Sequence, residues 1–239
     1  YQTQKNILML SDYFNQEQRM KSTFLGSEST WDYFHKNKDL IIDQLGPCPD
    51  YDQIYGHLWS NTKMCSSFPV MVAKLIIDKF KPSKVFDPCA GWGDRMLACA
   101  ATGVPYTGVD PNKDLQTGYQ NIVTTFKLDP EKYKVIESPF EDLDLGQLGK
   151  FPLIFTSPPF FNMEGYSDHP TQSCIKFPIY RKWKHGFLFP MIKGCVDLLE
   201  PKGKLVIYVN NIKKYRILDD TKFYLDTLKV RYMGKIFWK

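Results

Sequence analysis

Four consecutive residues carry groups that suit a flat ring bearing an amino group: Ser157, Pro158, Pro159 and Phe160. The Ser157 hydroxyl and the Pro158 carbonyl can accept hydrogen bonds from an amine, and the Phe160 ring can stack on a planar partner. None of these groups is a strong nucleophile. The segment is therefore expected to hold and orient an amine beside a second reactant.

An apolar strand is expected to position these residues. Residues 153–155 are Leu, Ile and Phe, and the two prolines that follow end the strand because proline cannot donate to a neighbouring strand. Ligands of open α/β sheets bind at the carboxyl ends of the strands. Ser157 and Phe160 are therefore expected to face a ligand crevice.

A turn with two glycines lies earlier in the chain, in the sequence D-P-C-A-G-W-G of residues 87–93. Residues 84–86 read as a first strand and residues 96–101 as the helix that follows, so Gly91 and Gly93 fall in the turn between them. Glycine in such a turn lets the backbone approach a ligand closely. Taken alone, the two glycines indicate a cofactor only weakly.

A second strand, residues 104–110, ends in Asp110. A carboxylate at this place can accept hydrogen bonds from both hydroxyls of a ribose. The third glycine of a dinucleotide fingerprint is missing, because Met96 occupies its position. The pattern therefore favours a nucleoside cofactor without a pyrophosphate.

The ordered combination of D-P-x-A-G-x-G, an acidic residue after the second strand, and S-P-P-F resembles the class I S-adenosylmethionine-dependent amino-methyltransferases. Members of that family methylate the exocyclic amine of adenine or cytosine in nucleic acid. The resemblance covers residues 66–210 and implies a Rossmann-like, doubly wound, mostly parallel α/β sheet. It also implies methyl transfer from S-adenosylmethionine to adenine N6 or cytosine N4, with DNA favoured over RNA and the base flipped out of a duplex.

The same resemblance assigns roles to individual residues. It places the methionine part of the cofactor at the glycine turn, the ribose at Asp110, and the adenine near residues 137–142, where either Glu141 or Asp142 accepts from its amino group. The expected cofactor-binding residues are Phe68, Asp87, Pro88, Ala90, Gly91, Gly93, Asp110, Phe140 and Glu141. The expected catalytic residues are Ser157, Pro158, Pro159 and Phe160.

Two residues depart from the commonest pattern of the family. Ser157 stands where adenine-specific members more often carry Asp or Asn, and Phe160 stands in place of the more frequent Tyr. Adenine and cytosine therefore both stay open as the target base.

A polar segment of residues 162–177 follows the S-P-P-F motif and is too long for a minimal connection; such loops often recognise ligands. Asn210 or Asn211, after the last buried strand, is expected to border the pocket. The expected contacts of the target base are Phe161, Asn162, Glu164 and Tyr166.

The charge of the chain suits a polyanionic partner. Its 239 residues carry 31 Lys and Arg against 26 Asp and Glu, a formal net charge of +5. Basic residues recur between positions 176 and 239 with aromatic residues among them, a pattern typical of surfaces that bind a phosphate backbone and stack on bases. Nucleic acid is the expected partner, and a protein partner subunit is a further candidate. The interleaved aromatic residues include Trp183, Tyr215, Tyr232 and Trp238.

Cysteine spacing and hydropathy indicate a soluble intracellular protein. The six cysteines and four histidines do not have the spacing of a metal site, so no metal is expected. No apolar run approaches the roughly eighteen residues of a membrane span, so no membrane contact is expected.

Two parts are expected along the chain. Residues 1–62 are expected to form a polar, aromatic-rich extension or cap with one helix over residues 30–45, and residues 63–239 the methyltransferase domain. The tail, residues 228–238, is expected to fold back as strands.

Two other functions fit parts of the pattern. One is a protein or small-molecule amide or amine N-methyltransferase, since glutamine-modifying relatives also use a P-P-aromatic loop; Ser157 argues against it. The other is a non-catalytic subunit that keeps the fold and binds nucleic acid. The intact cofactor residues, Asp87 and Asp110 among them, argue against that role.

Overall fold

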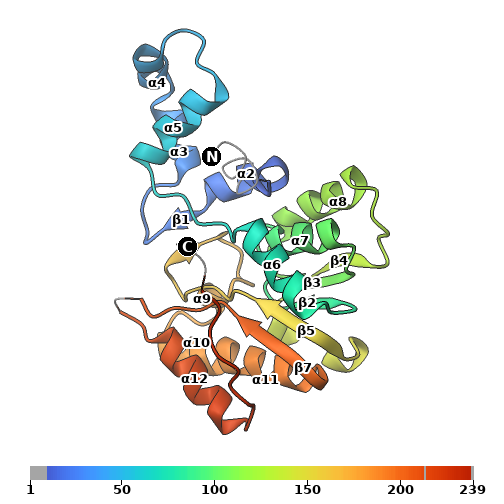
Figure 1. The fold of residues 1–239 in the computed structure, drawn as a ribbon. Helices are drawn as coiled ribbons and strands as arrows, with labels where there is room; N and C mark the ends of the chain where they lie inside the picture. The colour runs from blue at the N-terminus through green and yellow to red at the C-terminus, as the bar shows by residue number, and fades with distance from the viewer. Residues whose placement is uncertain (1–9, 213, 238–239) are drawn as a thin grey trace.

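The computed structural model describes residues 10–212 and 214–237, so Lys213, Trp238 and Lys239 of the expected nucleic-acid surface lie outside the described residues. At its centre is a five-stranded sheet in the order β4-β3-β2-β5-β7, with every neighbouring pair parallel (Figure 1). The order reverses between β2 and β5, as in a doubly wound sheet. The predicted Rossmann-like α/β fold is therefore confirmed. The strands are β2 (Val85–Asp87), β3 (Tyr106–Asp110), β4 (Tyr133–Glu137), β5 (Phe151–Thr156) and β7 (Leu199–Ile207).

The central strands are apolar along their length. Val85 and Phe86 of β2 and Leu153 and Ile154 of β5 show no exposed surface. Strands that helices cover on both faces have such continuous apolar runs. This is why residues 153–155 could be recognised as a strand from the sequence.

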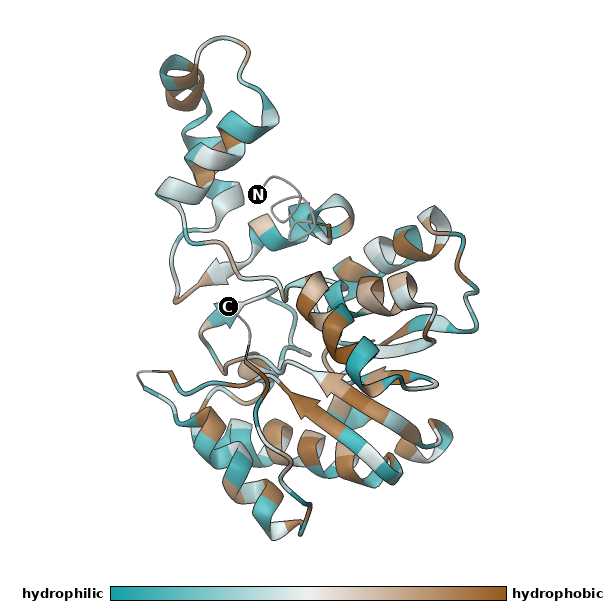
Figure 2. Cartoon of the chain, in the orientation of Figure 1, coloured by the Kyte–Doolittle hydropathy of each residue, from teal (hydrophilic) through white to brown (hydrophobic). Residues whose placement is uncertain are grey.

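Helices cover both faces of the sheet (Figure 1). Each layer packs on its own hydrophobic cluster, and Figure 2 shows hydrophobic residues along β5 and β7 between the layers. None of the described helices is long and apolar enough to cross a membrane. One layer contains α6 (Val70–Phe80), α7 (Asp94–Thr102), the 3-10 turn η1 (Lys113–Leu115) and α8 (Gln116–Thr125). The other contains η2 (Phe140–Asp142), η3 (Leu145–Gln147), α10 (Tyr180–Trp183), the π-helical turn η4 (Lys184–Leu188), α11 (Phe189–Asp197) and α12 (Ile217–Thr227).

The N-terminal segment is attached to the sheet region at two places. Its helix α2 lies against α8, and its strand β1 pairs antiparallel with β6, which belongs to the loop after β5. Helices α3, α4 and α5 project away from the sheet (Figure 1). The elements are α2 (Asp12–Lys21), β1 (Thr23–Phe24), α3 (Thr30–Lys36), α4 (Lys38–Leu45), α5 (Tyr51–Asn61) and, in the loop, β6 (Glu164–Gly165) and α9 (Ser173–Lys176).

The single helix predicted over residues 30–45 is wrong, because α3 and α4 are separate helices. They divide at Asn37, whose φ of −112° and ψ of 18° are not helical. The Asn37 side-chain amide donates to the Tyr33 carbonyl over 2.8 Å. Asn often breaks a helix in this way, because its side chain competes for the backbone hydrogen bonds.

The strands predicted for the tail are also wrong over residues 228–237, which contain no strand. Two residues interrupt an extended run there, since Lys229 has a φ of 54° and Gly234 a φ of 122°. Within the described chain, the outer edge of β7 therefore has no partner strand.

The packing of α2 on α8 is expected to depend on Gly118. A Cβ atom there would lie 1.9 Å from Asn15 Oδ1, and Asn15 cannot move aside without losing the bond from its Nδ2 to the Trp92 carbonyl (3.0 Å). Gly118→Ala is expected to lower the free energy of unfolding by about 1–3 kcal/mol in urea denaturation. Gly56→Ala on α5 is the control, because no atom lies within 4 Å of its added Cβ. A Gly118 variant as stable as the control would contradict this packing.

Candidate active site

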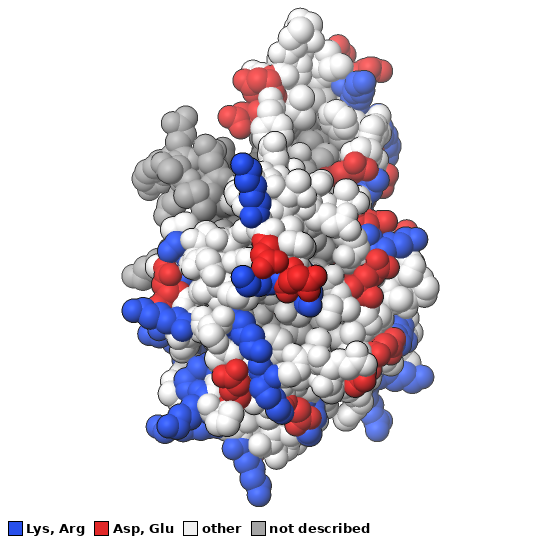
Figure 3. Space-filling view, turned by 90° about the vertical axis from the view of Figure 1, so that its right-hand side faces the viewer, with Lys and Arg blue, Asp and Glu red and all other residues white. Residues whose placement is uncertain are grey.

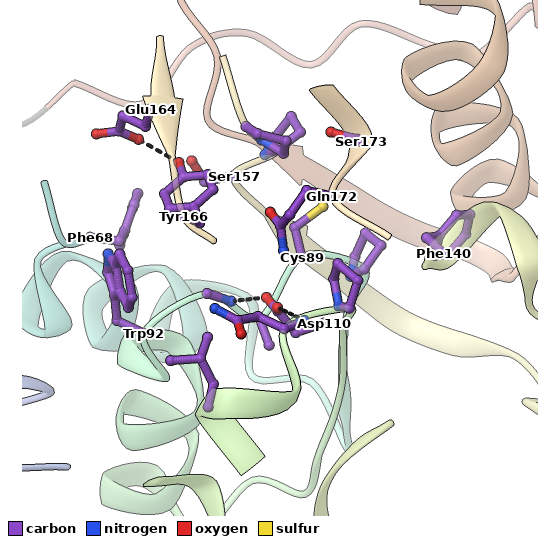
Figure 4. A pocket seen from close by; sticks show the side chains of 18 of the residues that line it. Phe68, Cys89, Trp92, Asp110, Phe140, Ser157, Glu164, Tyr166, Gln172 and Ser173 are labelled. Atoms are coloured by element: carbon purple, nitrogen blue, oxygen red, sulfur yellow. Dashed lines mark hydrogen bonds between the residues drawn. The ribbon is translucent and has the colours of Figure 1, made fainter. Parts of the chain in front are cut away.

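A cavity of about 300 Å³, called the pocket below, lies at the carboxyl ends of the strands. Both sequence motifs line it, the glycine turn from one side and the S-P-P-F segment from the other (Figure 4). The two motifs therefore share one ligand space. The expected site residues that line it are Phe68, Pro88, Ala90, Gly91, Asp110, Phe140, Glu141, Ser157, Pro158, Pro159, Phe160, Glu164 and Tyr166.

Several expected site residues do not line the pocket. Gly93 has a φ of 91° and is the N-cap residue just before α7, so it shapes the turn. Asn162 is exposed on the surface beside the S-P-P-F segment. The residues outside the lining are Asp87, Gly93, Asp142, Phe161, Asn162, Asn210 and Asn211.

Phe161 belongs to the hydrophobic core and not to the pocket wall. It is 2% exposed, and its ring centroid lies 4.9 Å from that of Tyr215 and 5.6 Å from that of Trp183. Trp183 itself has no exposed surface, and its indole donates to Ser173 Oγ over 3.0 Å. The expectation that Trp183 stacks on bases at the surface is therefore wrong, because its indole belongs to the same buried hydrophobic cluster as Phe161.

Asp87 is fully buried below the glycine turn. Its carboxylate accepts hydrogen bonds from Arg95 Nε (2.6 Å) and from the Tyr106 hydroxyl (2.8 Å). It also accepts from the Cys89 N–H (3.2 Å), and the Cys89 carbonyl accepts from Arg95. Asp87 therefore supports the turn from beneath without touching the pocket.

Asp110 joins the glycine turn to the end of β3. One carboxylate oxygen accepts from the Gly91 N–H (2.8 Å) and the other from the Asn112 N–H (2.9 Å), bonds drawn in Figure 4. Burial raises the pKa of Asp110 to about 6, although the two backbone bonds oppose that change. A ligand that donates hydroxyl protons to this carboxylate would stabilise its charged form.

Two more buried carboxylates line the pocket near Phe68. Asp94 accepts from the Phe68 N–H over 3.1 Å, and burial raises the pKa of Asp94 to about 6. Glu164 accepts from the Ser66 N–H (3.2 Å) and from the Tyr166 hydroxyl, and burial raises its pKa as well. This end of the pocket therefore concentrates negative charge that is poorly hydrated.

Positive charge is scarce in the pocket. Among the described residues, Arg95 is the only Lys or Arg in the lining, and it is paired with Asp87 at 2.6 Å. No cluster of His, Cys, Asp or Glu in the described chain is arranged to hold a metal ion. The pocket therefore suits a ligand with positive charge and offers no cation for a phosphate.

The loop of residues 162–177 forms part of the pocket wall. Near one end, Tyr166 packs edge-on against Trp92 with ring centroids 5.7 Å apart. Farther along, Thr171 Oγ1 donates to the Pro111 carbonyl (3.3 Å), just after β3. The loop thus bridges two walls of the pocket.

Many lining residues were not among the expected site residues, Asp94 and Arg95 included. Trp92 lies inside the recognised glycine turn, and its indole donates to the Ser66 carbonyl over 3.1 Å. Tyr208 follows β7, so its position at a strand end was a usable signal. No local pattern marks Gln172 and Ser173, because only the path of the loop brings them to the pocket.

Comparison with known proteins gives no match in sequence. No family model and no curated protein matches the chain. Several solved structures are similar in fold. A precorrin 8w decarboxylase from Methanobacterium thermoautotrophicum is 14% identical, with a TM-score of 0.49 over 69% of this chain and 74% of that chain. An S-adenosylmethionine-dependent methyltransferase from Agrobacterium tumefaciens is 19% identical, with a TM-score of 0.46 over 66% of this chain and 51% of that chain.

A third similar structure is an rRNA methylase from Streptococcus thermophilus, 14% identical, with a TM-score of 0.45 over 69% of this chain and 81% of that chain. This chain thus spans about half of the Agrobacterium protein and more of the other two. The residues of the pocket, and not these similarities, decide which reaction the chain can carry out.

The ion pair below the glycine turn is expected to be necessary for folding. Asp87→Asn leaves the Arg95 guanidinium buried without its ion-pair partner, since the Asp87 and Arg95 side chains are 0% and 5% exposed. The free energy of unfolding is expected to fall by about 3–5 kcal/mol. Asp219→Asn is the control; it breaks the Arg216–Asp219 pair, which is 82% and 38% exposed, and should cost less than about 1 kcal/mol. Equal losses in chemical denaturation would contradict a structural role for Asp87.

Proposed function

We propose that this chain transfers a methyl group from S-adenosylmethionine to the exocyclic amine of adenine or cytosine in nucleic acid, with DNA favoured over RNA. The observation that carries the proposal is the shared pocket, in which Asp110 and the glycine turn face the Ser157–Phe160 segment. A nucleoside site and an amine site in one cavity are what such a transfer requires.

The charge of the pocket supports this cofactor over a dinucleotide. S-adenosylmethionine carries a sulfonium and an ammonium group and has no phosphate. The buried carboxylates Asp94, Asp110 and Glu164 favour positive charge, and no unpaired cation in the described lining would hold a pyrophosphate. Asp110, bonded to the Gly91 N–H, would accept from the ribose hydroxyls.

The S-P-P-F segment would hold the acceptor amine. When bound, S-adenosylmethionine supplies an electrophilic methyl group. The Ser157 hydroxyl and the Pro158 carbonyl accept the two amine hydrogens and keep the nitrogen lone pair directed at that methyl, while Phe160 supports the ring face. The nitrogen takes the methyl as the bond from that carbon to the sulfonium sulfur breaks, which leaves a neutral thioether, and the nitrogen then loses one proton to solvent. The chain would accelerate this step by positioning the two reactants and by excluding water until the bond has formed.

A nucleic-acid substrate agrees with the distribution of charge. The chain has a formal net charge of +5 although the pocket is acidic. The side that carries α8 and β4 shows Lys and Arg interspersed with Asp and Glu, with basic residues more frequent along its lower edge (Figure 3). After β7, exposed Lys214 and Arg216 follow Tyr208, which lines the pocket. Basic groups there would contact phosphates while a flipped base enters.

Methyl transfer to nucleic acids tests the proposal directly. Labelled S-adenosylmethionine is incubated with single- and double-stranded DNA and RNA, and the nucleosides are analysed by mass spectrometry. Label in N6-methyladenine or N4-methylcytosine supports the proposal and identifies the base. Cofactor binding without transfer to any nucleic acid contradicts it, and label in added proteins or small amines would identify an N-methyltransferase of another substrate class.

The Ser157→Ala, Phe160→Ala double variant is expected to lose transfer while keeping the cofactor. It removes one amine acceptor and the stacking ring, so single-turnover transfer should fall by about 10²-fold or more, and the dissociation constant for S-adenosylmethionine should change less than about threefold. Phe223→Ala, at a 67% exposed position on α12, is the control for loss of a phenylalanine. A comparable loss of cofactor binding would mean that the segment belongs to the cofactor site.

Cofactor affinity is expected to fall in acid. Burial places the pKa of Asp110 at about 6 in the free protein, and ribose hydroxyls that donate to its charged form would lower that pKa in the complex. The affinity for S-adenosylmethionine should therefore be constant above about pH 7 and decline as the pH falls through about 6. Titration of a single carboxylate can lower the affinity by up to about tenfold per pH unit. Isothermal titration calorimetry between about pH 5 and pH 8 measures this.

Two variants identify the group responsible, because burial also raises the pKa of Asp94 to about 6. Asp110→Asn should bind weakly and lose the Asp110 part of the pH dependence, whereas Asp94→Asn should keep it. A wild-type affinity that is constant over this range would contradict the role given to Asp110.

A further inference from the structure

Tyr208 stands at the mouth of the pocket, next to the S-P-P-F segment. Its N–H donates to the Thr156 carbonyl over 2.9 Å, which fixes it beside the residue that precedes Ser157. Its side chain lines the pocket and is nevertheless 39% exposed. A ligand that enters at this side must therefore pass the Tyr208 ring.

Tyr208 forms a corner with two other rings of the lining. Its ring centroid lies 6.2 Å from that of Phe160, with an angle of 82° between the planes. Its ring centroid also lies 5.5 Å from that of Phe68, with an angle of 78° between the planes, and Phe68 is only 7% exposed. Buried Phe68 therefore supports the Tyr208 ring in an orientation nearly perpendicular to Phe160.

Two perpendicular rings constrain different motions of a flat ligand. A base that lies flat on Phe160 can still slide and turn in its own plane, because stacking constrains only the distance between the two faces. A ring that stands beside Phe160 at 82° to it can cross that plane and limit how far the edge of the base moves. Methyl transfer is sensitive to such motion, since a misplacement of about 1 Å can cost about 10²-fold in rate.

We propose that the Tyr208 ring is a side wall of the target-base site and sets the in-plane orientation of the base that stacks on Phe160. The inference rests on the proposed function and adds a residue that follows β7 to the four of the S-P-P-F segment. The ring, and not the hydroxyl, performs this role. Loss of the wall should also weaken discrimination between adenine and cytosine, because bases of different outline would no longer meet the same boundary.

The test compares Tyr208→Ala and Tyr208→Phe with the wild-type chain in single-turnover methyl transfer to a saturating DNA oligonucleotide containing both bases. Tyr208→Ala should transfer about 10²-fold more slowly, with a smaller ratio of transfer to the preferred base over the other. Tyr208→Phe should stay within about threefold of wild type, and both variants should bind S-adenosylmethionine within about twofold of wild type. Tyr13→Ala, at an 81% exposed position on α2, is the control for loss of a tyrosine.

The outcomes separate this inference from the proposed function. If the wild-type chain methylates nucleic acid and Tyr208→Ala does so at the same rate and with the same base ratio, the inference about Tyr208 is overturned and the proposed function stands. Loss of cofactor binding in Tyr208→Ala, or failure of Tyr208→Phe to restore the rate, also overturns it, since the ring would then serve the cofactor site or act through its hydroxyl. A wild-type chain that binds the cofactor and methylates no nucleic acid overturns both.

Discussion

The buried carboxylate of Asp87 is the constraint on which the pocket depends. One charge at the end of β2 binds Arg95 of α7 and Tyr106 of β3, so it joins three elements below the glycine turn. A carboxylate without such partners would be very costly to bury. The pair also holds the main chain of Cys89 through both its N–H and its carbonyl. The turn is thereby ordered before a ligand arrives, which reduces the conformational entropy that binding must remove.

Of the two adjacent phenylalanines in the S-P-P-F-F sequence, Phe161 anchors the turn in the core and Phe160 lines the pocket. Phe161 adopts a φ of 57°, a left-handed conformation that costs a non-glycine residue about 1–2 kcal/mol. Its ring is 2% exposed in the core against Trp183 and Tyr215, and full burial of a phenylalanine contributes about 1.5–3 kcal/mol. The burial offsets the strained backbone. The same turn directs Phe160 to the pocket.

The fold and the two motifs could be predicted because their signals are local: apolar runs mark β2 and β5, and prolines and glycines mark their ends. The orientation of single side chains could not be predicted from such local signals. Asp87 was expected to face the ligand, but successive side chains of a strand point to opposite sides, and Asp87 points to the core. Gln172 and Ser173 reach the pocket only through the path of a long loop. The exposed Asn162 and the buried Phe161 show that closeness to a motif does not place a side chain in the pocket.

Within the proposed function, the contrast between an acidic pocket and a basic chain determines how a substrate is presented. The lining carboxylates Asp94, Asp110 and Glu164 lie in an environment that raises their pKa values, so a phosphate brought beside them would meet uncompensated negative charge. A free nucleotide would be disfavoured for this reason. A base within a polymer avoids the repulsion, because its phosphates can stay outside at exposed basic residues such as Lys214 and Arg216 while only the neutral ring passes Tyr208. The acidity that would hold a cationic cofactor would then also select an extruded base over a mononucleotide.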